Sequence, residues 1–439
     1  MSRVEVSPIS NPLSLRRNFS WTLMGNVVYT ACQWGMLVVI ARLGSPEKVG
    51  QFTLGLAVTA PVILLTNLQL RDVQATDANR QYEFGDYLSL RMISTIISLL
   101  IILGIIALAD YSREAAWVIF FLGMSRALDA LSDIFYGFIQ LHERMARIAI
   151  SMMLKGGLSL LLLGVGMYVS HSVVGGAIGL MIASLLVLIG YDFYSILLVS
   201  RQAVPPEKRN FSASNRSELR SLRPQWQWKK LRKLTAYALP LGLVMLLFSL
   251  NVNIPRYLVE WHLGEHTLGI FAAIASLPLA GNMVMSALGQ AAIPRLAKYY
   301  AAGNRAAFRT LLLKSVGVGG LLGGIGVGIV LLKGQELLTL LFGEEYGQQA
   351  DLLVWLMIPA AIGYAGSFLG NGMTAAHYFR AQIPLFVTVT TVTTVASLWL
   401  LPIMGLYGIA IALLLAVFVQ VAISSGVIIH ALHKVGRQV

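Results

Sequence analysis

The chain has 439 residues, of which 56% are hydrophobic and only 12% are charged. A soluble protein carries about 25% charged residues, so this chain lacks the charge to cover two or three soluble domains. The composition therefore predicts a polytopic membrane protein. The net charge of +13 would favour nucleic acid in a soluble protein. In a membrane protein, an excess of lysine and arginine on the inner side also gives a positive net charge. We therefore expect no nucleic-acid partner.

Continuous apolar stretches recur along the whole chain, each near the length that crosses a bilayer as a helix. They do not alternate between polar and apolar residues, as the strands of a membrane barrel would. They predict an all-α polytopic membrane protein with about 12 transmembrane helices. The expected spans are residues 19–41, 49–70, 92–109, 115–139, 148–169, 174–199, 236–259, 267–292, 310–332, 351–370, 381–401 and 405–430.

The positions of lysine and arginine predict the orientation of these spans. With both ends inside, twenty-six of the 33 basic residues fall in inner segments, Arg91 among them. The outer segments hold Arg42, Lys48, Arg113 and Lys333. This asymmetry predicts a cytoplasmic N-terminus and C-terminus. The three remaining basic residues, Arg126, Lys155 and Arg256, fall inside spans.

A long basic stretch divides the expected spans into two sets of six. We expect a cytoplasmic tail at 1–18, a six-helix bundle at 19–199, a basic cytoplasmic linker at 200–235, a second bundle at 236–430 and a tail at 431–439. The linker is expected to lie against anionic lipid headgroups.

Three pairs of similar segments occur in the same order in both halves. Residues 43–57 resemble 263–275, with Gly50 and Phe52 matching Gly269 and Phe271. Residues 137–148 match 372–383, and residues 175–180 match 408–413. Because six is even, both halves enter the membrane in the same direction. The repeats are thus parallel, an arrangement that predicts two bundles around a central cavity.

Motifs for metal or nucleotide chemistry are weak in this chain. His262, Glu265 and His266 match H-x-x-E-H, but Gly264 interrupts the helix that a zinc site of this kind needs. The phosphate-binding pattern G-x-x-x-x-G-K-[ST] does not occur. We expect no metal site, no cofactor and no enzymatic activity.

Charged residues inside the expected spans carry more information. Arg126, Asp129 and Asp133 are spaced by three and four residues, so they share one helix face. A charge at the bilayer centre costs about 2.5–3.5 kcal/mol on insertion scales, so this face should meet water or partners. Lys155 and Asp192, on the next two spans, are the expected partners.

The second half has its own polar set, Asn251, Asn253 and Arg256, on the seventh span. Two interpretations of the buried charges stay open. They form a salt-bridge network that fixes bundle packing, or they line a cavity in which Arg126, Lys155 and Arg256 face an anionic headgroup.

Several stretches resemble bacterial O-antigen and capsule flippases of the multidrug/oligosaccharidyl-lipid/polysaccharide exporter superfamily. They include LGSPEKVGQF after the first span, residues 238–277 and LLTLLFGEEYGQQADLLVWL before the tenth. Residues 66–78 and 129–151 are similar to bacterial members of the same group. The resemblance extends over essentially the whole chain.

The resemblance implies a transporter in the bacterial cytoplasmic membrane. Its substrate would be a polyprenyl-diphosphate-linked oligosaccharide, such as an O-antigen, capsule or exopolysaccharide repeat unit, carried from the inner to the outer leaflet by alternating access. The implied partners are the lipid bilayer, this substrate and other polysaccharide-assembly proteins. Candidate residues in the matching stretches are Arg71 and Asp72 at the cytoplasmic mouth, and Asp129, Asp133, Asn251, Asn253 and Arg256.

Two alternatives remain. An ion-coupled small-molecule exporter of the multidrug and toxin extrusion type would share this architecture, with Asp129, Asp133 or Asp192 serving the coupling. A membrane glycan polymerase or ligase is less favoured, because it should have a large outer loop with His and Arg. The longest outer connection, about 333–350, has one basic residue and no histidine.

Overall fold

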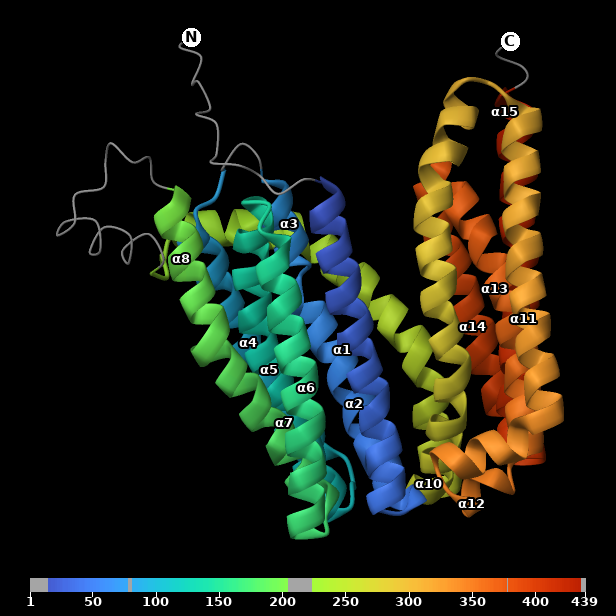
Figure 1. Ribbon diagram of the computed structural model, residues 1–439, viewed down its shortest axis with the longest axis horizontal. Helices are drawn as coiled ribbons and strands as arrows, with labels where there is room; N and C mark the ends of the chain where they lie inside the picture. Colours follow the sequence, from blue (N-terminus) through green and yellow to red (C-terminus); the bar gives the residue numbers. More distant parts are fainter. Residues whose placement is uncertain (1–14, 78–80, 204–222, 377, 436–439) are drawn as a thin grey trace. The chain divides into compact units, whose positions relative to one another are not determined.

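The computed structural model describes residues 15–77, 81–203, 223–376 and 378–435. Within these ranges the chain is almost entirely helical and contains no strand (Figure 1). Most of the expected tail at 1–18 and the middle of the expected linker at 200–235 lie outside the described residues. The predicted all-α fold class is confirmed.

The helices follow one another with short connections. The first part of the chain contains α1 (Leu15–Leu43), α2 (Pro46–Asn67), α3 (Leu70–Thr76), α4 (Phe84–Leu108), α5 (Arg113–Leu141), α6 (Met145–Ser170), α7 (Val173–Val187), the π-helical turn η1 (Leu188–Asp192) and α8 (Phe193–Ala203). The second part contains α10 (Trp228–Ala301), α11 (Arg305–Leu341), α12 (Glu344–Gly347), α13 (Ala350–Ala375), α14 (Phe379–Met404) and α15 (Leu406–Val435).

Each expected span falls on helical structure, and the span at 174–199 covers α7, η1 and α8 in succession. Among the described residues, ten helices are long and apolar enough to cross a membrane. One of them, α10, contains two expected spans, separated where Gly264 has a φ of 81°. Helix α5, which carries three charged side chains from its middle onward, is an eleventh element of membrane-spanning length. Helix α4 begins at Phe84, about two turns before the expected start at residue 92.

The chain forms two compact units. The first contains Met1–Val39 and Val58–Leu246, and the second contains Ile40–Ala57 and Leu247–Val439. In the first unit, α5 is central and contacts α3, α4, α6 and α7. In the second unit, α13 contacts α11, α14 and α15.

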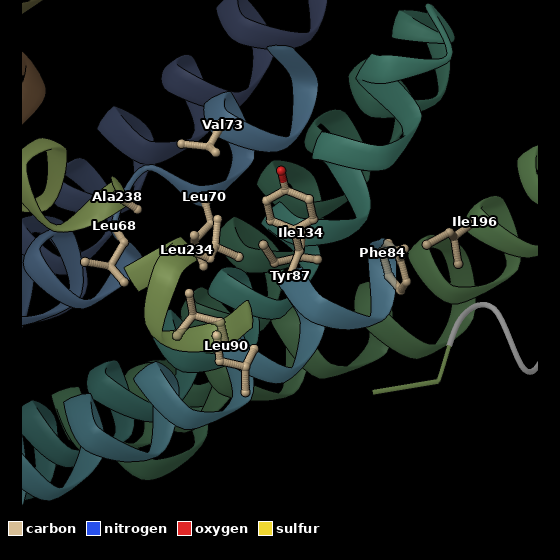
Figure 2. Packing of buried hydrophobic residues seen from close by; sticks show 11 residues of the cluster. Leu68, Leu70, Val73, Phe84, Tyr87, Leu90, Ile134, Ile196, Leu234 and Ala238 are labelled. Carbon is tan, nitrogen blue, oxygen red and sulfur yellow. The ribbon is translucent and has the colours of Figure 1, made fainter. Parts of the chain in front are cut away.

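A buried apolar cluster joins the helix ends of the first unit (Figure 2). Leu70 from α3, Tyr87 from α4 and Ile134 from α5 are at most 2% exposed within it. Leu231 and Leu234 place the start of α10 in the same cluster. An ion pair of 3.6 Å between Lys230 and the buried Asp86 adds to this attachment. The cluster thus fixes α3 and the start of α4 against the charged part of α5.

The two copies of the first repeat motif touch each other within the second unit. A Cβ atom on Gly50 would overlap the carbonyl oxygen of Glu265, and one on Gly269 would overlap that of Pro46. Gln51 also donates a hydrogen bond to the Glu265 carboxylate at 3.0 Å. Glycine at both motif positions is therefore required by the close approach of the α2 and α10 backbones.

Two further polar residues near this contact, Arg42 and His266, have structural partners. Arg42 donates hydrogen bonds to the carbonyls of Thr339, Leu340 and Leu341, the last residues of α11. The carbonyls of Leu340 and Leu341 have no partner within their own helix, and a cation at a helix C-terminus interacts favourably with the helix dipole. Of the H-x-x-E-H residues, His266 pairs with Glu345 at 2.9 Å.

Candidate functional site

Helix α5 presents the charged residues of the first unit on one side. It begins after Ser112, whose Oγ accepts a hydrogen bond from the Ala115 N–H at 3.2 Å and caps the helix. Arg126, Asp129 and Asp133 then follow at spacings that bring them to adjacent turns of the same side. Because α5 has neighbours on several sides, these charges meet groups from other helices.

Asp129 is the centre of a first ion-pair cluster. Its Oδ1 lies 2.9 Å from Lys155 Nζ on α6, and its Oδ2 lies 3.9 Å from Arg126 Nη1. Ser184 on α7 donates a hydrogen bond to Oδ1 at 3.0 Å. One carboxylate is thus held by two cations and a hydroxyl from three helices, α5, α6 and α7.

Asp133 is the centre of a second cluster. It lies 3.2 Å from Arg71 Nη1 on α3 and 3.7 Å from Arg91 Nη2 on α4. Arg91 also donates a hydrogen bond to the side chain of Asn67. The sequence interpretation placed Arg91 in a connecting segment, but the residue belongs to α4, which begins at Phe84, and its side chain is 0% exposed.

Tyr136 joins the two clusters. The Arg71 guanidinium and the Lys155 ammonium lie 5.4 Å and 5.5 Å from the centre of its ring, within cation–π range. Its hydroxyl lies 2.6 Å from Ser151 Oγ, and Ser151 donates a hydrogen bond to Asp192. Apart from Asp72, the predicted charges of the first unit therefore belong to one polar network.

Exposure divides the network into two sets. The side chains of Arg126, Asp133, Arg71 and Asp129 are 36%, 30%, 29% and 22% exposed, respectively. Those of Lys155 and Arg91 are 6% and 0% exposed. The first set can meet water or a ligand directly. The buried Lys155 and Arg91 can act on a ligand only through Asp129 and Asp133, the carboxylates with which they form ion pairs.

The network is close to charge balance. Among the described residues it contains the cations Arg71, Arg91, Arg126 and Lys155, and the carboxylates Asp129, Asp133 and Asp192. Pairing of this kind offsets the cost of placing charges away from water. It also means that an anionic ligand competes with a carboxylate for each of these arginines.

The second unit holds a smaller polar group on α10. Arg256 Nη1 donates a hydrogen bond to Asn253 Oδ1 at 3.0 Å, and Asn253 Nδ2 donates to the Ser249 carbonyl at 2.9 Å. In the described part of the chain, Arg256 forms no ion pair with a carboxylate. Asn251 is half-buried on the same helix. Arg256 thus differs from the paired arginines of the first unit, which are Arg71, Arg91 and Arg126.

Two features of the site differ from what the residue pattern suggested. Asp72 is exposed on α3 and takes no part in either cluster, although its neighbour Arg71 does. The hydroxyl groups of Ser151 and Ser184, and the amide of Asn67, have no spacing signal that separates them from other polar residues of membrane helices. Arg91 was missed because α4 extends about two turns into the polar sequence before its apolar run.

Metal-binding geometry is absent from the described residues. No group of three or more His, Cys, Asp or Glu side chains is arranged there to hold a metal ion. His262 and Glu265 flank the turn at Gly264, where a continuous helix would be needed to align such ligands.

Solved transporter structures share this fold. An inward-facing multidrug resistance MATE family transporter of the MOP superfamily aligns with a TM-score of 0.69 at 15% identity, covering 94% of this chain and 99% of that chain. A single-residue mutant of the Vibrio cholerae MATE transporter VcmN aligns with a TM-score of 0.60 at 15% identity and 97% coverage of both chains. The chain thus has the fold of these multi-pass membrane transporters.

The sequence comparisons identify the family. The model of the family described as polysaccharide biosynthesis protein matches residues 15–300, and the chain belongs to that family. The capsular polysaccharide biosynthesis protein CapF of Staphylococcus aureus is 27% identical over 403 residues, 92% of this chain and 96% of CapF. The predicted membership of a polysaccharide biosynthesis family is confirmed.

Proposed function

We propose that this protein is a flippase for a polyprenyl-diphosphate-linked oligosaccharide. It would carry an O-antigen, capsule or exopolysaccharide repeat unit from the inner to the outer leaflet of the cytoplasmic membrane by alternating access. Family membership and the transporter fold support this proposal. The observation that carries it is a partly exposed row of charges: Arg126, Asp129 and Asp133 on α5, a helix of membrane-spanning length, with Arg71 on the short helix α3 paired to Asp133.

The chemistry of this row matches both ends of such a substrate. A guanidinium donates two parallel hydrogen bonds to phosphate oxygens, so Arg126 and Arg71 suit the diphosphate. The carboxylates of Asp129 and Asp133 accept hydrogen bonds from sugar hydroxyls. Each arginine shares an aspartate with a second cation when no ligand is present, and this pairing offsets part of the cost of placing the charges inside the membrane.

The orientation follows from the basic residues. We propose that both termini are cytoplasmic, because this places most lysines and arginines inside. The mouth residues Arg71 and Asp72 would then face the cytoplasm, where lipid-linked repeat units are assembled. Arg256 and Asn253 in the second unit would supply a further contact, because this arginine has no carboxylate partner among the described residues.

The decisive experiment is to delete the gene and locate lipid-linked glycan by leaflet. We expect single repeat units to accumulate on the cytoplasmic face. Single units left unpolymerised on the outer face would indicate a polymerase or ligase instead. An unchanged glycan would contradict both functions.

Replacing Arg256 with glutamine is expected to lower transport about tenfold or more. The change removes a charged hydrogen-bond donor, worth about 1.5–3 kcal/mol, and a factor of ten corresponds to about 1.4 kcal/mol. Transport is measured as outer-leaflet lipid-linked glycan in the complemented deletion strain. Arg113→Gln, at the exposed start of α5, is the matched control. Normal transport by Arg256→Gln, at an equal protein level, would remove Arg256 from the site.

A second candidate function is ion-coupled export of small molecules. The fold is shared with MATE transporters, and the first unit contains carboxylates inside membrane-spanning helices. This function predicts drug efflux that depends on an ion gradient and is lost on deletion. Wild-type drug resistance in the deletion strain would argue against it.

A further inference from the structure

Helix α2 passes from one compact unit to the other within its length. Its residues up to Ala57 belong to the second unit, and those from Val58 onward belong to the first. Helix α10 also changes unit, after Leu246. Both helices contain an interior proline, Pro61 in α2 and Pro255 in α10. A proline removes one backbone hydrogen bond and crowds the preceding turn, so each helix is weakened at that point.

Pro61 leaves one backbone carbonyl of α2 without its helical partner. In an α-helix, the N–H of residue 61 would donate to the carbonyl of Ala57, but proline has no N–H. Ala57 is 0% exposed, so water does not replace the missing donor. The Tyr257 hydroxyl on α10 donates a hydrogen bond to this carbonyl instead. Tyr257 thus supplies, from a second helix, the bond that Pro61 removes.

Close packing fixes α2 on both sides of this point. Its start is held against α10 in the second unit by the Gly50 and Gly269 contacts. Toward its end, within the first unit, a Cβ atom on Gly242 of α10 would overlap the carbonyl oxygen of Leu65. The stretch at 57–61 lies between these contacts and contains the weakened turn. Bending there disturbs neither contact.

We propose that residues 57–61 of α2 form a hinge between the parts of α2 that belong to the two units, and that the Tyr257 hydroxyl is the latch that holds this hinge. When the latch opens, the Ala57 carbonyl is free to tilt and α2 bends at Pro61. The neighbouring Arg256 forms no ion pair with a carboxylate among the described residues, so an anionic ligand that draws this arginine also moves the turn that carries Tyr257. The use of the hinge in transport rests on the proposed flippase function, whereas the latch does not.

The test of the latch is a double-mutant cycle on the full-length protein in detergent, followed by chemical unfolding. Pro61→Ala restores an N–H that can donate to the Ala57 carbonyl, so the Tyr257 hydroxyl becomes dispensable. We expect Tyr257→Phe to lower the ratio of folded to unfolded protein about tenfold in the wild type, because a buried acceptor loses its donor. In the Pro61→Ala background the same change should have little effect. An equal loss in both backgrounds would overturn the latch.

Tyr346→Phe is the matched control for loss of a hydroxyl group. Tyr346 is 2% exposed, and its hydroxyl group has no hydrogen-bond partner among the described residues, so we expect no loss of stability. A loss equal to that of Tyr257→Phe would contradict the latch. If Tyr257→Phe alone does not fold, recovery of folded protein by adding Pro61→Ala supports the latch, and failure to recover contradicts it.

The test of the hinge is transport by Pro61→Ala in the complemented deletion strain. We expect this variant to be at least as stable as the wild type and to move at least tenfold less glycan to the outer leaflet, because α2 is stiffened. Pro402→Ala, at an exposed proline near the end of α14, should transport normally. Normal transport by Pro61→Ala would remove the hinge. An unchanged glycan in the deletion strain would remove the flippase function, and the stability cycle would still decide the latch.

Discussion

Replacing Lys155 with methionine is expected to destabilise the protein by about 3–5 kcal/mol, the usual cost of removing one partner of a buried ion pair. The lysine side chain is 6% exposed, and Asp129 is 2.9 Å from its ammonium. Without it, the Asp129 carboxylate keeps only the longer contact to Arg126 and the hydrogen bond from Ser184. Chemical unfolding of the purified protein in detergent measures the effect.

A double variant separates the packing role of this pair from its transport role. Lys155→Met combined with Asp129→Leu removes both charges, and we expect it to recover most of the lost stability. If transport then returns as well, the pair serves packing only. If the protein is stable and inactive, the charges contact the substrate or respond to it.

The exposed pair of Lys333 and Glu336 provides the matched control. Its ammonium and carboxylate are 2.6 Å apart, yet the two side chains are 64% and 69% exposed. Water and salt screen such a pair, so Lys333→Met should change stability little. An equal loss in Lys333→Met and Lys155→Met would show that burial of the Lys155 pair is not what stabilises it.

Replacing Gly269 with alanine is expected to destabilise the second unit by about 1–3 kcal/mol, the typical cost of overpacking. The added methyl group would overlap the Pro46 carbonyl, which belongs to a helix backbone and cannot rotate away. The α2 and α10 backbones must therefore separate, which also stretches the hydrogen bond from Gln51 to Glu265. The unfolding midpoint is the measurement.

Gly320→Ala is the control for this substitution. Gly320 lies in α11, and a Cβ atom there would meet no heavy atom within 4 Å. Alanine favours the helix over glycine by about 1 kcal/mol, so this variant should be as stable as the wild type or more so. If Gly269→Ala behaves like Gly320→Ala, the close approach of the two helices is not required.

The repeat motif shows what the residue pattern could predict and what it could not. Matching Gly50 with Gly269 indicated two related halves, but it gave no reason for the glycines. The structure supplies one, because the two copies pack against each other. A contact between residues more than two hundred positions apart depends on how helices pack, which no local pattern specifies.

Arg91 and Asp192 show the same limit at the candidate site. Counting basic residues placed Arg91 in a connecting segment, since an apolar run does not reveal how far its helix extends into polar sequence. The sequence predicts Lys155 and Asp192 as partners of the charged face of α5. Lys155 pairs with Asp129 on that face, whereas Asp192 accepts a hydrogen bond from Ser151 instead. The choice between the two carboxylates is made by side-chain geometry at η1 and α6.

The sequence by itself determined the class of the protein, the positions of its membrane-spanning helices and the family to which it is related. These follow from composition, from runs of apolar residues and from local motifs, because the bilayer imposes helices of a given length. Only the tertiary structure decided which charges are paired, which are buried and which remain accessible on α5. The physical reason is that ion pairs and hydroxyl chains form between helices, where distances of a few ångströms decide the partner.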